Sequence, residues 1–141
     1  MTQATLVELF ERNRRHVESL PEGHFEEVQE GQEPAVVSVC CSDTRVSQEG
    51  MWAIEEPGWL FTAGNIGNQV WDTHDGELVL GGDVLYPIRH AGTEVAVVVG
   101  HTGCGAVTAA LEAVRADEPL EAPPGIEARI EPLRPVVEDG L

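Results

Sequence analysis

The sequence contains no lysine. All eight basic residues are arginine, the acidic residues number 25, and the formal net charge is -17. Such an excess of negative charge repels phosphate backbones and anionic lipid surfaces, so neither nucleic acid nor membrane partners are expected. No apolar run is long enough to cross a bilayer. A dense carboxylate surface stays solvated at high salt, where its mutual repulsion is screened. Together with the lack of lysine, it favours adaptation to high salt over an ordinary acidic enzyme.

Cysteine is also scarce. Only three occur, Cys40, Cys41 and Cys104, and two of them are adjacent, which makes a poor disulfide framework. This usage favours metal or nucleophile chemistry in a reducing compartment, so the cytoplasm is the predicted location. Residues 1–4 lead into a polar amphipathic stretch rather than into the apolar core of a signal peptide.

The 141 residues suit one α/β domain, 1–141, which begins with a helical arm over residues 1–20. Apolar periodicity over 4–19 indicates a helix whose apolar face we expect to pack on a neighbouring subunit. Strands and helices then alternate, with strands predicted over 35–40, 59–63 and 95–99, and helices over 82–91 and 106–115. Residues 116–125, rich in proline and acid, are predicted to form a loop, and a short helix disturbed by Pro132 and Pro135 is expected from Ile126.

The predicted strands are short and largely apolar, as at 95–99, where every residue is valine or alanine. Such strands are typical of a parallel sheet that helices cover. The sequence therefore predicts an α/β fold with a parallel β-sheet core flanked by helices. In the helix over 82–91, Val84, Leu85 and Ile88 are expected on the side that faces the sheet.

Side chains able to carry chemistry follow two of these strands. Cys41 comes directly after the strand at 35–40, and His101 and Cys104 follow the strand at 95–99. In an open α/β sheet, ligands bind beyond the carboxyl ends of the strands. If the two strands are neighbours, two thiolates and one imidazole converge at that edge, whereas Cys40 points to the opposite side and belongs to the core.

Two cysteines and one histidine are a known ligand set for catalytic Zn²⁺. Zinc usually takes four ligands, so three from the protein leave one position for water or substrate, and thiolates select against magnesium and calcium. The helix expected directly after Cys104 points its free N–H groups at the same place, which favours both a thiolate and an anionic product.

Asp43 and Arg45 lie two residues apart in the segment after Cys41, where they can pair. An arginine fork fixes a carboxylate through two parallel hydrogen bonds. A carboxylate held in this way can orient an attacking nucleophile, while an unpaired Asp43 could instead turn onto the metal. We expect Arg45 to favour the orienting role.

A purely structural interpretation stays open at this point. Cys41 and Cys104 would then pack as small hydrophobic residues, and His101 would be an ordinary histidine at a strand end. Asp43 and Arg45 would form a surface salt bridge that contributes little. The coincidence of all five residues at two strand ends favours the metal site.

The two motifs strongly resemble those of the β-class carbonic anhydrases, in a form similar to haloarchaeal members. The family's Cys-x-Asp-x-Arg motif matches Cys41–Arg45, and its His-x-x-Cys motif matches His101–Cys104. In addition, Gly31–Pro34 is similar to the family's Gly-Gln-x-Pro segment, and Phe61–Asn68 is similar to its strand with an Asn-x-x-Asn turn.

The resemblance implies an enzyme, a carbonate dehydratase that reversibly hydrates carbon dioxide to bicarbonate and a proton. Zn²⁺ would be held by Cys41, His101 and Cys104, and Asp43 and Arg45 would form the catalytic dyad. The resemblance also implies a homodimer or a higher homo-oligomer, in which the N-terminal helix wraps a neighbour. Substrate contacts would then come from Gln32 across the dimer interface, from Tyr86 and from Gly103.

Two positions differ from the family pattern. Gly64 stands where arginine is usual, and Ser38 stands where some members carry a tryptophan that forms a regulatory bicarbonate pocket. Family members usually continue with another helix and strand, so the chain resembles a version shortened at its C-terminus. Two alternatives follow: hydrolysis of carbon disulfide or carbonyl sulfide at the same site, and a zinc-binding assembly protein without turnover.

Overall fold

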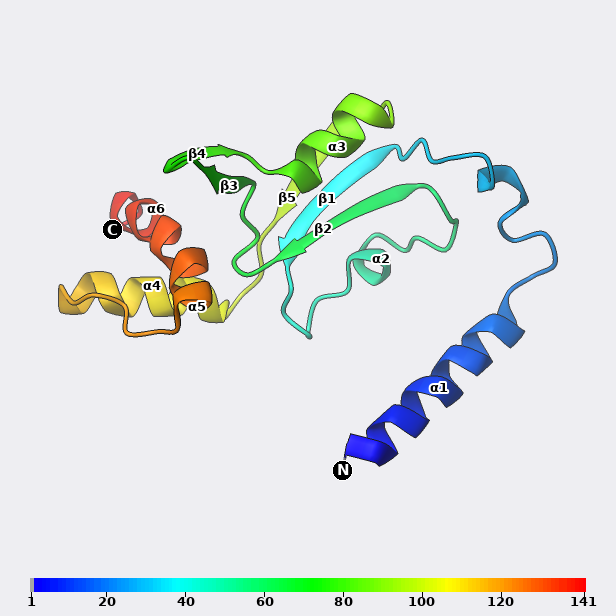
Figure 1. Ribbon diagram of the computed structural model, residues 1–141, viewed down its shortest axis with the longest axis horizontal. Coiled ribbons are helices and arrows are strands. Elements are labelled where there is room, and N and C mark those ends of the chain that lie inside the picture. Colours follow the sequence, from blue (N-terminus) through cyan, green and yellow to red (C-terminus); the bar gives the residue numbers. More distant parts are fainter. Residues whose placement is uncertain (1) are drawn as a thin grey trace. The chain divides into compact units, whose positions relative to one another are not determined.

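The computed structural model describes residues 2–141, which divide into two compact units, 2–31 and 32–141. The first unit holds helix α1 (Thr2–Ser19) and the 3₁₀ turn η1 (Glu26–Val28), shown in blue in Figure 1. The helix predicted over 4–19 is therefore confirmed. None of the described residues of α1 is buried, and Phe10 on its apolar face is 75% exposed. The single zinc-enzyme domain expected over 1–141 stays a prediction.

The second unit is built on a parallel three-stranded sheet with the order β2-β1-β5 (Figure 1). Its strands are β1 (Val36–Cys41), β2 (Leu60–Asn65) and β5 (Val95–Val99). Valine and cysteine suit the middle strand because their compact side chains pack on both faces, and Val37, Val39 and Cys40 are fully buried. The predicted fold class is confirmed, and so is the core position of Cys40.

Strand β5 lies at the edge of this sheet, since its hydrogen-bonded neighbour is β1 alone in the described chain. Its valines are correspondingly open, with Val95 49% and Val98 56% exposed. A run of valines has the composition of a buried central strand, and composition does not distinguish that position from an edge.

The connection from β1 to β2 contains the short helix α2 (Gln48–Met51), and the connection from β2 to β5 contains helix α3 (Gly82–His90). Helix α3 packs on the sheet through Val84, which joins Val37, Val39 and Ala63 in one buried cluster. Leu85 and Ile88, expected on the same side, are instead 36% and 39% exposed, because Val84 and Pro87 define the buried stripe of this helix.

A β-hairpin that the hydropathy pattern did not predict precedes α3. Strands β3 (Trp71–His74) and β4 (Glu77–Leu80) pair antiparallel around the turn at Asp75 and Gly76. Both turn residues have positive φ, 49° and 79°, which is the conformation that an Asp-Gly pair adopts readily in a two-residue hairpin loop. The Asp-Gly pair was therefore a usable signal in the sequence.

The carboxyl-terminal segment forms helices α4 (Gly105–Ala116), α5 (Pro124–Ile130) and α6 (Arg134–Asp139), with the 3₁₀ turn η2 (Glu131–Leu133) between the last two. The predicted loop over 116–125 is present as far as the start of α5. The helical segment is divided around Pro132 and Pro135, as expected: α5 ends at Ile130, and each proline lies in the first turn of the next element, η2 or α6, where proline is tolerated.

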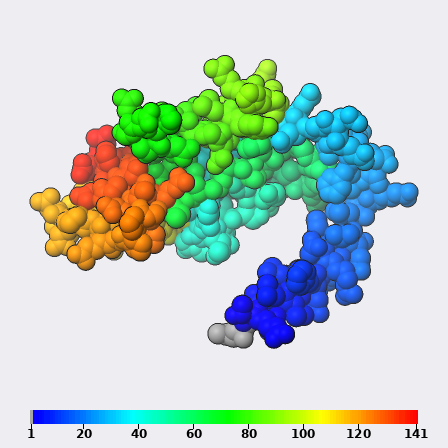
Figure 2. All heavy atoms as spheres, viewed as in Figure 1, coloured from blue at the N-terminus to red at the C-terminus, as the bar shows by residue number. Residues whose placement is uncertain are grey.

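These helices bury a small core of their own, made of Cys104, Ala106, Ala110, Ile130 and Leu133. In Figure 2 their atoms, yellow to red, form one continuous surface with the green hairpin, and Arg129 of α5 lies 3.6 Å from Asp72 of β3. In the part of the chain that the structure describes, no helix is long and apolar enough to span a membrane.

Candidate metal centre

The carboxyl edge of the sheet brings Cys41, His101 and Cys104 together. Cys41 is the last residue of β1, and the pairing of Cys40 with Val99 makes the segment after β5 leave the sheet beside it. Cys104 then caps the N-terminus of α4. One ligand atom of each residue lies within 4.8 Å of the other two, and the two sulfurs are 3.9 Å apart. We call these three residues the donor cluster.

A hydrogen bond fixes the ring orientation of His101. Its Nδ1 lies 3.0 Å from the carbonyl oxygen of Thr102, which assigns the ring proton to Nδ1 and leaves a lone pair on Nε2. Nε2 is buried and has no hydrogen-bond partner in the described part of the protein. A buried lone pair without a partner is costly, and a metal ion would satisfy it.

The surroundings of Cys41 favour its thiolate form. Burial raises the pKa of the thiol, but nearby backbone N–H groups, that of Gly67 foremost, lower it, and the net shift is downward. The neighbouring Cys41 sulfur in turn raises the pKa of His101. The adjacent Cys40 behaves in the opposite way, because burial in the core raises its pKa. The structure therefore separates a metal-binding type of cysteine from a structural one at consecutive positions.

Asp43 and Arg45 form the pair that their spacing predicted. The Arg45 guanidinium donates from Nε to Asp43 Oδ1 at 2.8 Å and from Nη2 to Oδ2 at 2.7 Å, and the Arg45 backbone N–H adds a third bond at 2.9 Å. These bonds hold the pKa of Asp43 well below its usual range. Asp43 is not a member of the donor cluster in the described structure, and it lines the same cavity as Cys41.

Arg45 also ties together the two segments that supply the site. Its Nη2 donates to the carbonyl oxygen of Gly103 at 3.0 Å, which links the loop after β1 to the loop after β5. Gly103 has φ +64°, and an added Cβ would lie 3.6 Å from the Arg45 guanidinium. Sequence reasoning predicted a substrate contact for Gly103 and missed this bond. The glycine between the predicted ligands His101 and Cys104 was the available signal.

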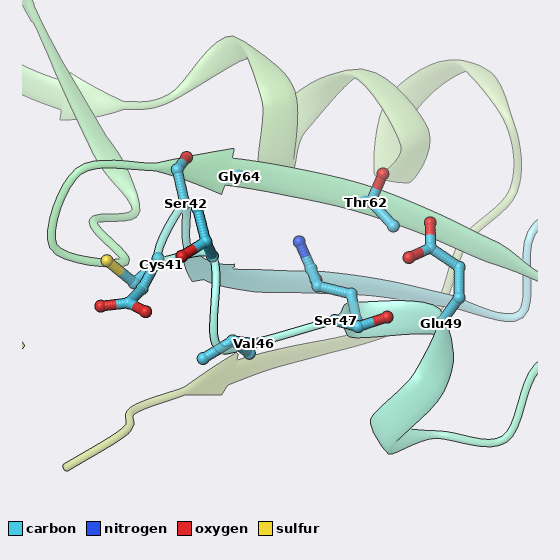
Figure 3. Close-up of a pocket in the computed structure, with 10 residues that line it drawn as sticks. Cys41, Ser42, Val46, Ser47, Glu49, Thr62 and Gly64 are labelled. Carbon is cyan, nitrogen blue, oxygen red and sulfur yellow. The ribbon is translucent and has the colours of Figure 1, made fainter. Parts of the chain in front are cut away.

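A cavity of about 410 Å³ opens beside Cys41 and Asp43. Figure 3 shows its walls, with Cys41, Ser42 and Gly64 at one end and Thr62 and Glu49 at the other. Gly64 lines this cavity and has no side chain to occupy it, although an added Cβ would lie at an ordinary contact distance of 3.5 Å from Ser42 Oγ. This is the position where the sequence departs from the arginine that is usual in the family.

Gln32 and Tyr86 are not brought to the donor cluster of their own chain. Gln32 is exposed before the amino end of β1 and lines a cavity with His90 and Gly92. Cys41 lies at the other end of β1, and the six residues of this strand span roughly 16 Å, so Gln32 and Cys41 lie at opposite ends of the sheet. Tyr86 is 53% exposed on α3, where its ring contacts those of Phe61 and His90.

An open parallel α/β sheet with two thiols and an imidazole gathered beyond its carboxyl edge defines an α/β protein built around a candidate metal site. Residues 36–140 match the family model described as carbonic anhydrase, and the chain therefore belongs to the carbonic anhydrase family.

Known proteins support the same assignment. A carbonic anhydrase from Synechococcus elongatus is 34% identical over 96 residues, which cover 62% of this chain and 32% of that protein. The solved structure of the β-carbonic anhydrase CcaA matches with a TM-score of 0.72 at 27% identity, over 98% of this chain and 61% of that one. The β-carbonic anhydrase CafA of Aspergillus fumigatus matches with a TM-score of 0.73 at 26% identity, over 96% and 61%. The chain thus spans a third to three fifths of these relatives.

Proposed function

We propose that this chain carries a zinc-dependent carbonic anhydrase site that reversibly hydrates carbon dioxide to bicarbonate and a proton. The observation that carries the proposal is the convergence of the donor cluster with a carboxylate that Arg45 holds beside it. The match of residues 36–140 to the carbonic anhydrase family supports the same reaction.

The residues present fit zinc. Two sulfurs and one imidazole nitrogen are the soft and borderline donors that zinc prefers, and the lone pair of His101 Nε2 has no partner among the described protein atoms. Cys41 is already biased toward the deprotonated form that binds metal. When bound, zinc supplies Lewis-acid chemistry that makes water a nucleophile near neutral pH.

The remaining steps fall to the protein. Asp43 accepts a hydrogen bond from the attacking water and sets its direction toward the carbon of carbon dioxide, and Arg45 keeps Asp43 in that orientation. The exposed backbone at Gly103 borders the substrate, while its carbonyl fixes Arg45. The free N–H groups at the N-terminus of α4 favour the developing negative charge of bicarbonate.

We propose that the working form is a homodimer or a multiple of it, in which Gln32 and Tyr86 of one protomer contact substrate at the site of the other. Both residues are exposed and lie away from the donor cluster of their own chain, which supports this arrangement. The exposed apolar face of α1, with Leu6, Leu9 and Phe10, supports a contact with a second copy.

We also propose a haloarchaeal-like protein of a reducing, cytoplasmic and salt-rich environment. Its three cysteines are free thiols, which supports a reducing environment. Its net charge of -17 and its lack of lysine support a salt-rich one. Salt screens the mutual repulsion of these carboxylates, so the free energy of unfolding should rise from low salt to molar KCl. Equal stability in urea titrations at both salt concentrations would contradict the salt adaptation.

Metal content and stopped-flow hydration of the purified chain in molar KCl test the proposed function. We expect one zinc per chain and hydration activity in the wild type, and loss of both in Cys104→Ser and His101→Ala. Cys40→Ser is the matched control, because Cys40 lies in the core outside the donor cluster. Parallel assays with carbon disulfide and carbonyl sulfide identify the substrate. Zinc without turnover of any of the three gases would support an assembly protein, and activity in a zinc-free variant would refute the mechanism.

A further inference from the structure

The turn that follows β2 lies directly against the first metal ligand. Asn65, the last residue of β2, is the register partner of Cys41, and its carbonyl oxygen accepts a hydrogen bond from the Ser42 backbone N–H at 2.8 Å. We call residues 65–69 the 65–69 loop. Any change in this loop is therefore transmitted to the strand end that presents the Cys41 sulfur.

The side chain of Asn65 closes this loop on itself. Its Oδ1 accepts from the Gln69 backbone N–H at 2.7 Å, and its Nδ2 donates to the Gln69 carbonyl oxygen at 2.8 Å. Between the two anchors, Gly67 and Asn68 have positive φ angles of 81° and 45°. A left-handed backbone costs free energy in a non-glycine residue such as Asn68 and persists only where its surroundings impose it. The Asn65 amide supplies that constraint.

Gln69 anchors the far side of the loop. Its side chain is 5% exposed, and its Nε2 donates to the carbonyl oxygens of Ile66 at 2.8 Å and Arg129 at 2.5 Å. Its Oε1 accepts from Trp71 Nε1 at 2.8 Å. The loop is thus fixed to α5 and to the hairpin, so Asn65 closes it against a rigid support.

Gly67 is the residue that this closure places. An added Cβ would lie 2.9 Å from Leu133 Cδ1 and 3.4 Å from Ala106 Cβ, so the glycine backbone is pressed against the core that contains Cys104. Cys41 packs against the same core, so the closed loop lies beside the strand end that presents its sulfur. A side chain at Gly67 has no room.

We propose that Asn65 is a positioning residue for the metal ligand Cys41: its side-chain amide keeps the 65–69 loop closed, so that the end of β1 that presents Cys41 keeps its backbone bond to this loop. The inference deepens the proposed function and rests on zinc being held by the donor cluster. Partners that orient metal ligands are worth about 10–100-fold in metal affinity, and the same loss is expected when Asn65 is removed.

The test compares the full chain with Asn65→Ala and Thr93→Val. Thr93→Val is the matched control, because it removes another side chain–backbone bond, from Thr93 Oγ1 to the Pro34 carbonyl oxygen at 2.9 Å, near the amino end of the sheet. Zinc affinity is measured by chelator competition, and thiolate coordination by the charge-transfer absorption of the Co²⁺ form. We expect Asn65→Ala to lose about 10–100-fold in zinc affinity with an altered Co²⁺ spectrum, and Thr93→Val to keep both.

Wild-type zinc affinity and Co²⁺ spectrum in Asn65→Ala, or the same losses in Thr93→Val, would overturn the inference. A second measurement on the wild type decides it even if Asn65→Ala does not fold: the Gln69 amide hydrogen, which is bonded to Asn65 Oδ1, must exchange slowly with solvent, and exchange at the rate of an open loop overturns the assignment. A wild-type chain that binds no zinc would refute the proposed function instead, while the Gln69 amide still reports on the loop.

Discussion

At the carboxyl end of β1, three segments of one chain meet, whereas at its amino end the residues expected to contact substrate lie exposed. The carboxyl end gathers the donor cluster. Beside it, hydrogen bonds of 2.7 to 3.0 Å hold the Asp43–Arg45 dyad and the 65–69 loop. The amino end offers Gln32 beside a cavity, with no side-chain hydrogen bond of its own in the described structure. One chain therefore assembles the donor cluster and the Asp43–Arg45 pair, while the contacts proposed for Gln32 and Tyr86 would come from a second chain.

The contrast has a topological reason. The carboxyl ends of parallel strands all lie at one edge of the sheet, so loops from distant parts of the sequence meet at that edge. The amino ends receive the returning connections and converge less tightly. Four experiments test how far this division extends.

The largest effect is expected from the pair of adjacent cysteines. Cys41→Ser should remove the zinc and reduce hydration to background, because a hydroxyl group is a poor replacement for a zinc-binding thiolate. Cys40→Ser changes the neighbouring core residue and should cost stability with zinc content retained. Metal analysis and stopped-flow hydration of both variants check this prediction. Equal zinc loss in the two would show that position along the strand does not separate their roles.

The next effect concerns the dyad. Arg45→Gln removes the bidentate pairing with Asp43 and the bond to the Gly103 carbonyl oxygen, so Asp43 is free to turn. We expect hydration to fall about 10–100-fold with zinc content unchanged, as for other groups that orient a metal site. The ratio of kcat to zinc content is the measurement. Full activity at full zinc loading would show that Asp43 needs no orientation by Arg45.

Much of the carboxyl end could be predicted from the sequence. The ligands follow apolar strands, and two residues of spacing suffice for the pairing of Asp43 with Arg45. The 65–69 loop could not be derived in the same way, since its closure depends on a side chain meeting its own backbone four residues later. The edge position of β5 and the exposed faces of Leu85 and Ile88 were equally out of reach, because tertiary packing, and not hydropathy, selects which apolar face is covered.

At the amino end of β1, the structure of a single chain does not explain the predicted roles. Gln32 and Tyr86 were predicted from a family resemblance, and among the described residues neither belongs to the donor cluster or lines the cavity beside Cys41. A residue that acts on another protomer's site leaves no signal in the packing of its own unit. Oligomeric measurements, and not further sequence patterns, must therefore decide their role.

The third experiment mixes two defective variants. Gln32→Ala keeps the donor cluster, and His101→Ala keeps Gln32 but loses a ligand. If Gln32 acts across a two-fold interface, random exchange makes half of the dimers mixed, and one of their two sites is complete. Activity should then recover to about a quarter of the wild-type value. Subunit exchange followed by hydration assays checks this, and a mixture that shows only the mean of the two parents would assign Gln32 to its own chain or to no role.

The smallest effect is a pH dependence of stability. Arg45 holds the pKa of Asp43 below its ordinary value of about 3.9, so the charged form stabilises the folded state fully above that value. As the pH falls below about 4, the unfolded carboxyl takes up a proton first, and the stabilisation decreases until the folded carboxyl is protonated too. The advantage of the wild type over Asp43→Asn in urea unfolding with chelator present should therefore shrink toward pH 2.5. The side chain of Arg45 is 64% exposed, so solvent keeps the difference small. A difference that stays constant from pH 7 to pH 2.5 would show that the ion pair does not stabilise the fold.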